Sequence, residues 1–76
     1  MTTQDKISLL KKLLIYQKEI LANEVIIADS EKILKNKPDD DLILHWIESA
    51  RRSKKGYELD YENALLLLTE EKESVL

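Results

Sequence analysis

Residues 7–34 read ISLLKKLLIYQKEILANEVIIADSEKIL, and this stretch predicts one long helix with apolar surface for more than one partner. At about 100° per residue, it carries two apolar stripes. The first stripe holds Ile7, Leu10, Leu14, Leu21, Val25 and Ala28, and the second stripe holds Leu9, Leu13, Tyr16, Ile20, Ile27 and Leu34. A polar line of Gln17, Glu24 and Glu31 runs between them. A helix with a single neighbour needs a single stripe, so the other stripe indicates a second partner.

The chain has one strong helix boundary, at Lys35-Asn36-Lys37-Pro38. Proline disfavours helical geometry at the residue before it, and lysines favour the last turn of a helix. Asp39 is then the expected N-cap of a second helix, as Thr2 or Thr3 is of the first. We therefore expect an all-α, coiled-coil-like hairpin in a single domain, residues 1–76, with antiparallel helices at about 3–36 and 40–71.

Gly56 could break the second helix and give a three-helix protein, but the apolar phase argues against a break. One heptad line holds Ile43, Ala50, Tyr57 and Ala64, and another holds Ile47, Lys54, Tyr61 and Leu68, with Trp46 and Leu65 expected on the same side. Both lines cross Gly56 without losing register, whereas a loop would normally reset them. The second helix is therefore expected to be continuous.

Folding back at Pro38 sets the expected register of the two helices. It places Leu34 near Ile43, Ala28 near Ala50, Leu21 near Tyr57 and Leu10 near Leu68, and it brings Lys54 close to Glu24. In this arrangement it is mainly the first stripe that packs against the second helix. The second stripe is then assigned to a protein partner, through Leu9, Leu13, Tyr16, Ile20 and Ile27.

Composition limits the classes of function. The chain has 12 basic and 15 acidic residues, a net charge of −3, and no cysteine. Attraction to DNA or anionic lipid is therefore weak, disulfides are excluded, and a reducing compartment is compatible. No apolar run approaches the roughly 20 residues that a membrane-spanning helix needs. We expect a cytoplasmic protein whose small core is completed by self-association or by a helical partner.

Few residues could carry chemistry. His45 is the single histidine and is expected to be exposed, and Asp39, Asp40 and Asp41 lack the ligand spacing of a calcium loop. No catalytic residue, cofactor site or metal site is predicted, so the chain is not expected to be an enzyme. The basic cluster Arg51, Arg52, Lys54 and Lys55 is the sharpest charge feature. The favoured interpretation is a solvated helix surface, in which Glu48 pairs with Arg51 or Arg52 and Glu58 pairs with Lys54. The runner-up is a docking site for an acidic protein, and a nucleic-acid site is a further alternative.

Several large apolar residues lie off the expected seam and indicate a binding role. They are Leu66 and Leu67 on the second helix, and Ile15, Ile26 and Ile33 on the first. We therefore predict a non-enzymatic protein–protein interaction module, acting as an adaptor, co-chaperone or inhibitor. In length and in its helix–turn–helix rhythm around Lys35 to Asp41, the whole chain resembles the small hairpin co-chaperones of type III secretion needle subunits. That resemblance implies a partner with a concave helical-repeat surface.

Overall fold

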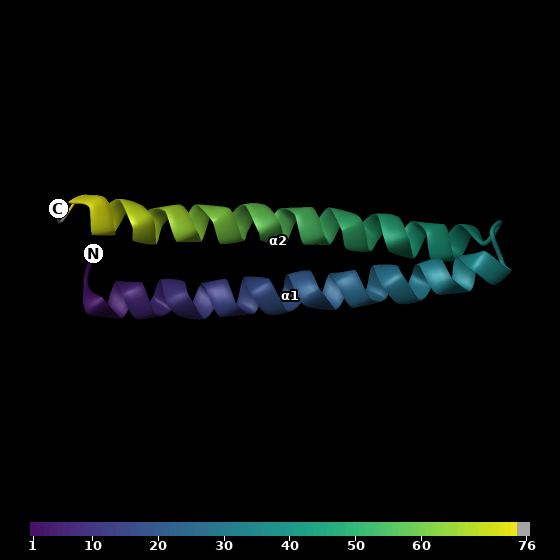
Figure 1. Ribbon diagram of the computed structural model, residues 1–76, viewed down its shortest axis with the longest axis horizontal. Helices are drawn as coiled ribbons and strands as arrows, with labels where there is room; N and C mark the ends of the chain where they lie inside the picture. The colour runs from purple at the N-terminus through teal and green to yellow at the C-terminus, as the bar shows by residue number, and fades with distance from the viewer. Residues whose placement is uncertain (75–76) are drawn as a thin grey trace.

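The computed structural model describes residues 1–74, with side chains described as far as residue 70, and shows an antiparallel helical hairpin (Figure 1). Helix α1 spans Thr3–Asn36 and helix α2 spans Asp41–Ser74. The two helices form a rod of 56 × 15 × 14 Å. The all-α hairpin predicted from the sequence is confirmed, with α2 extending three residues beyond its expected end at residue 71.

Helix α1 begins at a capping box. The Thr2 hydroxyl accepts a hydrogen bond from the Asp5 backbone N–H at 3.1 Å, and the Thr2 N–H donates to the Asp5 carboxylate at 3.2 Å. The two side chains thus satisfy two backbone N–H groups that have no partner within the helix. Of the two threonines that the sequence offered, Thr2 is the cap.

The turn around Pro38 places the second cap one residue later than predicted. The Lys37 N–H donates to the Ile33 carbonyl and ends α1, and the Asp40 N–H donates back to the Lys37 carbonyl. Asp39 therefore belongs to the turn, and its predicted capping role is wrong. The Asp40 carboxylate accepts from the backbone N–H groups of Leu42 and Ile43, at 3.1 and 3.3 Å, and caps α2 instead.

Helix α2 runs through Gly56 without a break, as the apolar phase predicted. Gly56 does not have a positive φ. A Cβ atom built at this position would meet nothing within 4 Å. The glycine is therefore neither a turn residue nor a position where the two helices of the hairpin need a close approach.

The helices meet along a seam in which each contributes residues at alternating spacings of four and three. These residues are buried or half-buried: Leu9, Leu13, Tyr16, Ile20, Asn23, Ile27, Ser30 and Leu34 on α1, and Ile43, Ile47, Ala50, Lys54, Tyr57, Tyr61, Ala64 and Leu68 on α2. The rings of Tyr16 and Tyr57 lie 6.2 Å apart, centre to centre. Both predicted heptad lines of α2 are confirmed, but Trp46 and Leu65 lie outside the seam and are exposed.

The assignment of the two stripes of α1 is wrong. The second stripe faces α2, so the predicted partner-binding residues Leu9, Leu13, Tyr16, Ile20 and Ile27 lie in the seam. The first stripe is exposed, and the register pairs expected for Leu10, Leu21 and Ala28 are not formed, because Leu9, Ile20 and Ile27 occupy the seam instead.

Charge explains why the second stripe is the one covered. Its heptad line continues through Asn23 and Ser30, which are small and neutral. The Asn23 side-chain amide donates a hydrogen bond to the Glu19 carbonyl at 2.9 Å. This N–H donor therefore keeps a partner although Asn23 is buried. The first stripe is bordered by Glu24 and Glu31, and burying carboxylates would cost far more than burying neutral polar groups.

Candidate interaction surfaces

Two ion pairs mark one edge of the seam. Lys54 Nζ lies 3.3 Å from Glu24 Oε1, as the expected register predicted. Arg51 Nη2 lies 3.0 Å from Glu31 Oε1. Because Leu10 lies three heptads before Glu31 and Leu65 lies two heptads after Arg51, Leu10 and Leu65 belong to this same edge of the rod.

An exposed apolar surface lies on this edge, towards the end of the rod where α1 begins. We call it the leucine flank, and it consists of Ile7, Leu10, Leu14, Leu21 and Leu65. Each of these side chains is more than 40% exposed, and Leu14 reaches 67%. Beside them, Glu62, Leu65, Leu66 and Thr69 line an open and mainly apolar hollow of about 270 Å³. The flank therefore offers apolar contacts to the side chains of another protein.

A second exposed apolar surface lies on the opposite edge. We call it the tryptophan flank, and it consists of Ile15, Ile26, Ile33, Trp46 and Leu67. Its members are 44–56% exposed. Leu67 and its neighbour Leu66, both predicted to bind a partner, are accessible for that role, which stays a prediction.

The middle of the tryptophan flank is recessed on α2. Ser53, Gly56, Tyr57 and Asp60 line an open hollow of about 360 Å³ on α2. Small side chains at Ser53 and Gly56 leave the helix backbone close to the surface there. Another helix could therefore approach the backbone of α2 closely at this point.

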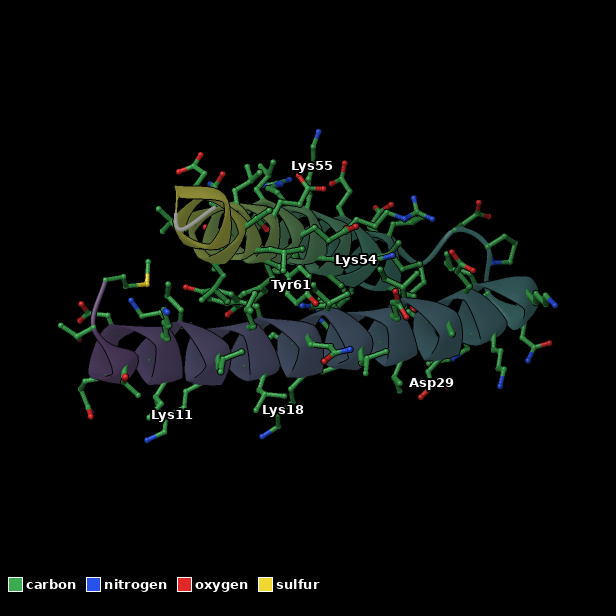
Figure 2. All side chains as sticks on the ribbon, turned by 60° about the vertical axis from the view of Figure 1, so that its left-hand side comes forward. Lys11, Lys18, Asp29, Lys54, Lys55 and Tyr61 are labelled. Carbon is green, nitrogen blue, oxygen red and sulfur yellow. The ribbon has the colours of Figure 1, made fainter. Side chains whose placement is uncertain are left out.

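The basic cluster does not form one surface. Arg51 and Lys54 are engaged with Glu31 and Glu24 across the seam. Figure 2 shows Lys54 directed towards α1, while Lys55 points away from it. The structure therefore divides the four cations predicted for electrostatic docking, Arg51, Arg52, Lys54 and Lys55, between the seam edge and the outer face of α2.

The outer faces of the rod are mainly polar. Figure 2 shows Lys11, Lys18 and Asp29 directed away from α2, and Asp29, which lies two heptads after Ile15, borders the tryptophan flank. On α2, His45 is exposed and lies one heptad before Arg52. Within the described residues, neither helix is long and apolar enough to cross a membrane. The two apolar flanks are thus the surfaces whose exposure needs an explanation.

Comparison of the chain with protein-family models, with curated proteins and with solved structures finds no match. The surface of the hairpin itself therefore has to indicate the function. Sequence reasoning missed the tryptophan flank because it placed Trp46 in the seam. A signal was present, since the heptad line of Trp46 continues through Ser53 and Asp60, which are polar residues typical of a seam edge.

Proposed function

We propose that this chain is a non-enzymatic protein–protein interaction module that binds through its exposed apolar flanks. One observation carries the proposal. Sixteen large apolar side chains among the described residues are more than 40% exposed, whereas the buried hydrophobic core consists of Leu13, Ile43, Ile47, Ala50 and Ala64. Ten of these side chains belong to the two flanks, and large exposed apolar patches on soluble proteins mark binding sites.

The free energy available from the flanks supports the proposal. Full burial of a large apolar side chain is worth about 1.5–3 kcal/mol, and the members of each flank are about half exposed. Covering the five members of one flank would then contribute roughly 4–8 kcal/mol before polar contacts. Association itself costs about 4–15 kcal/mol, so one flank is marginal alone, and a second flank or added polar contacts would give stable binding.

The charges favour a protein partner over nucleic acid. Arg51 and Lys54 are already paired within the hairpin, and the net charge of the chain is −3. A nucleic-acid surface would need unpaired cations on one face. We propose that the module acts in the cytoplasm, with co-chaperone, adaptor and inhibitor as its candidate roles. The likeness to secretion co-chaperones stays a prediction.

Sedimentation equilibrium on paired variants tests the proposal. Leu10→Glu with Leu14→Glu alters the leucine flank, and Ile26→Glu with Ile33→Glu alters the tryptophan flank. Val25→Glu with Leu59→Glu is the matched control, because both residues are exposed apolar residues on the outer faces. We expect at least one flank variant to weaken association while keeping the helical circular dichroism spectrum, and the control to leave association unchanged.

The opposite result is equally clear. A wild-type chain that remains a folded monomer at high micromolar concentration, and that recovers no protein partner from its host, would contradict the proposed function.

A further inference from the structure

We propose that the tryptophan flank is the face on which a second copy of this chain packs, with the two rods antiparallel about a two-fold axis. The product is a four-helix assembly whose leucine flanks face outward. This inference rests on the proposed function and deepens it, because it names the partner of one flank. Its basis is that the tryptophan flank is complementary to itself when one copy is reversed.

The complementarity is clearest along α1. With the axis between Ile20 and Leu21, Ile15 of one copy lies opposite Ile26 of the other, because the two residues are equally far from the axis. Lys12 then lies opposite Asp29 of the second copy, and by symmetry the pair occurs twice. Two apolar residues therefore meet, and opposite charges lie beyond them at both ends of this contact. Ile33, the third member of the flank on α1, faces Ser8 of the second copy.

Helix α2 matches itself about the same axis. The Lys54–Glu24 ion pair and the Tyr57–Tyr16 ring contact place the level of Ile20 near Gly56 and Tyr57 on α2. The two-fold axis therefore passes close to Gly56, at the hollow described above. At this point the absence of a side chain allows the backbones of the two copies to approach.

Further from the axis, two more contacts on α2 are suitable. Trp46 lies opposite Leu67 of the second copy, so both exposed side chains are covered. Ser53 lies opposite Asp60 of the second copy, where its hydroxyl can donate to the carboxylate. Neither Asp60 nor Glu19 gains an opposite charge, since Ala22 of the second copy faces Glu19.

Other arrangements are less complementary. If the two rods were parallel, residues at the same level would meet, and Glu19 would face Asp60 of the second copy. If the leucine flank were used in the antiparallel arrangement, Leu10 would face Glu31 and Gln17 would face Glu24. Both alternatives place carboxylates against unsuitable neighbours, which opposes binding.

The size of the flank is adequate for a stable dimer. The rod is 56 Å long and 14–15 Å across. A face of these dimensions provides about the 800 Å² per partner that standard protein interfaces bury. A contact along the full rod therefore falls within the range of specific assemblies.

A charge-exchange experiment tests the arrangement. Lys12→Glu and Asp29→Lys each replace two attractive contacts with two repulsive ones, so each variant alone should dimerise at least about tenfold more weakly than wild type. Mixed together, the two variants should form a heterodimer in which opposite charges meet again. The double variant should also recover its affinity. Lys12 and Asp29 lie about 25 Å apart along one helix, so recovery within a single chain is excluded.

Two further variants control the measurement. Lys11→Glu makes the same charge change on the outer face, and it should leave dimerisation unchanged. A Cβ atom at Gly56 meets nothing of the hairpin within 4 Å, whereas the longer side chain of Gly56→Leu would block the axis, so this variant should keep its helical spectrum and become monomeric. Ala28→Leu adds a similar side chain on the leucine-flank side and should remain dimeric. Sedimentation equilibrium and circular dichroism provide both readouts.

The outcomes separate this inference from the proposed function. A wild-type dimer in which the mixed variants fail to recover affinity would overturn the inference and leave the proposed function standing. A folded wild-type monomer would overturn the inference as well. The proposed function would then fail only if no other protein bound the hairpin.

Discussion

The two apolar stripes of α1 have opposite fates, although both keep a helical period. The second stripe contains the polar residues Asn23 and Ser30 and is nevertheless covered by α2. The first stripe has several large leucines and is left exposed, with Leu14 at 67%. Apolar content therefore did not determine which stripe is buried. The absence of charge along the whole line did, because an internal carboxylate is far more costly than an amide or a hydroxyl.

The border charges reinforce this choice. Glu24 and Glu31 lie beside the second stripe, where they meet Lys54 and Arg51 of α2. Had the first stripe been buried, these carboxylates would have had to enter the seam or turn away from their cations. In a long helix with two apolar stripes, the stripe that faces the neighbouring helix is thus determined by the charged residues beside each stripe as well as by the residues within it.

The largest expected effect is the difference in the free energy of unfolding between substitutions at two neighbouring residues, one on each stripe. Leu13 is 8% exposed in the seam, whereas Leu14 belongs to the exposed first stripe. We expect Leu13→Glu to lower the free energy of unfolding by about 3 kcal/mol or more, because it buries an unpaired charge. Leu14→Glu should change the free energy by about 0.5 kcal/mol or less. Urea unfolding followed by circular dichroism measures both, and equal losses would mean that the stripes are wrongly oriented.

A smaller effect is expected at Gly56, where the continuity of α2 determines how much of the second stripe is covered. Gly56→Ala should raise the free energy of unfolding by up to about 1 kcal/mol, since alanine favours a helix and meets no neighbour. The measurement is thermal unfolding at low protein concentration, where association contributes little. A clear loss of stability would indicate that the helix is interrupted and the stripe only partly covered.

Lys54 is a cation in the middle of an otherwise apolar line, and it contacts the border of the second stripe. Its side chain is 31% exposed and that of Glu24 is 47% exposed, so solvent screens their ion pair. We expect Lys54→Met to preserve the hairpin and to raise its free energy of unfolding slightly, by under about 1 kcal/mol. We expect the ion pair to help fix the register of the two helices and to add little stability. Strong destabilisation by Lys54→Met would show that the pair is needed for stability.

The smallest effect concerns the second border pair. The side chains of Arg51 and Glu31 are 62% and 51% exposed. Glu31→Gln should therefore reduce the free energy of unfolding by less than about 0.5 kcal/mol, and the difference should vanish at high salt. A double-mutant cycle with Arg51→Gln measures the coupling. A large coupling that persists in high salt would contradict the assignment of this pair to a solvated border.

The sequence was sufficient for the fold and for half of the seam. Pro38 and the neighbouring polar residues predicted the turn, and the two unbroken heptad lines predicted a continuous α2. The same register predicted the contact between Lys54 and Glu24. These features are local or follow directly from folding one helix back on the other, so the sequence periodicity alone is enough to predict them.

The stripe assignment and the caps required more than periodicity. Both stripes of α1 have a suitable period, and the choice depends on the cost of burying Glu24 and Glu31 relative to Asn23 and Ser30, which a count of apolar residues ignores. Similarly, Asp39 and Asp40 are equally good caps by residue type. The geometry of the turn, in which Asp40 donates to the Lys37 carbonyl, decides between them.

The hairpin also has a mechanical consequence. Helix α1 begins and α2 ends at the same end of the rod (Figure 1). A force that pulls Thr3 away from Ser74 therefore opens the seam from that end, and only the outermost layer of side chains resists at any moment. If the loaded ends lay at opposite ends of the seam, all layers would resist sliding together. The rod thus yields easily to tension applied between the outer ends of its two helices.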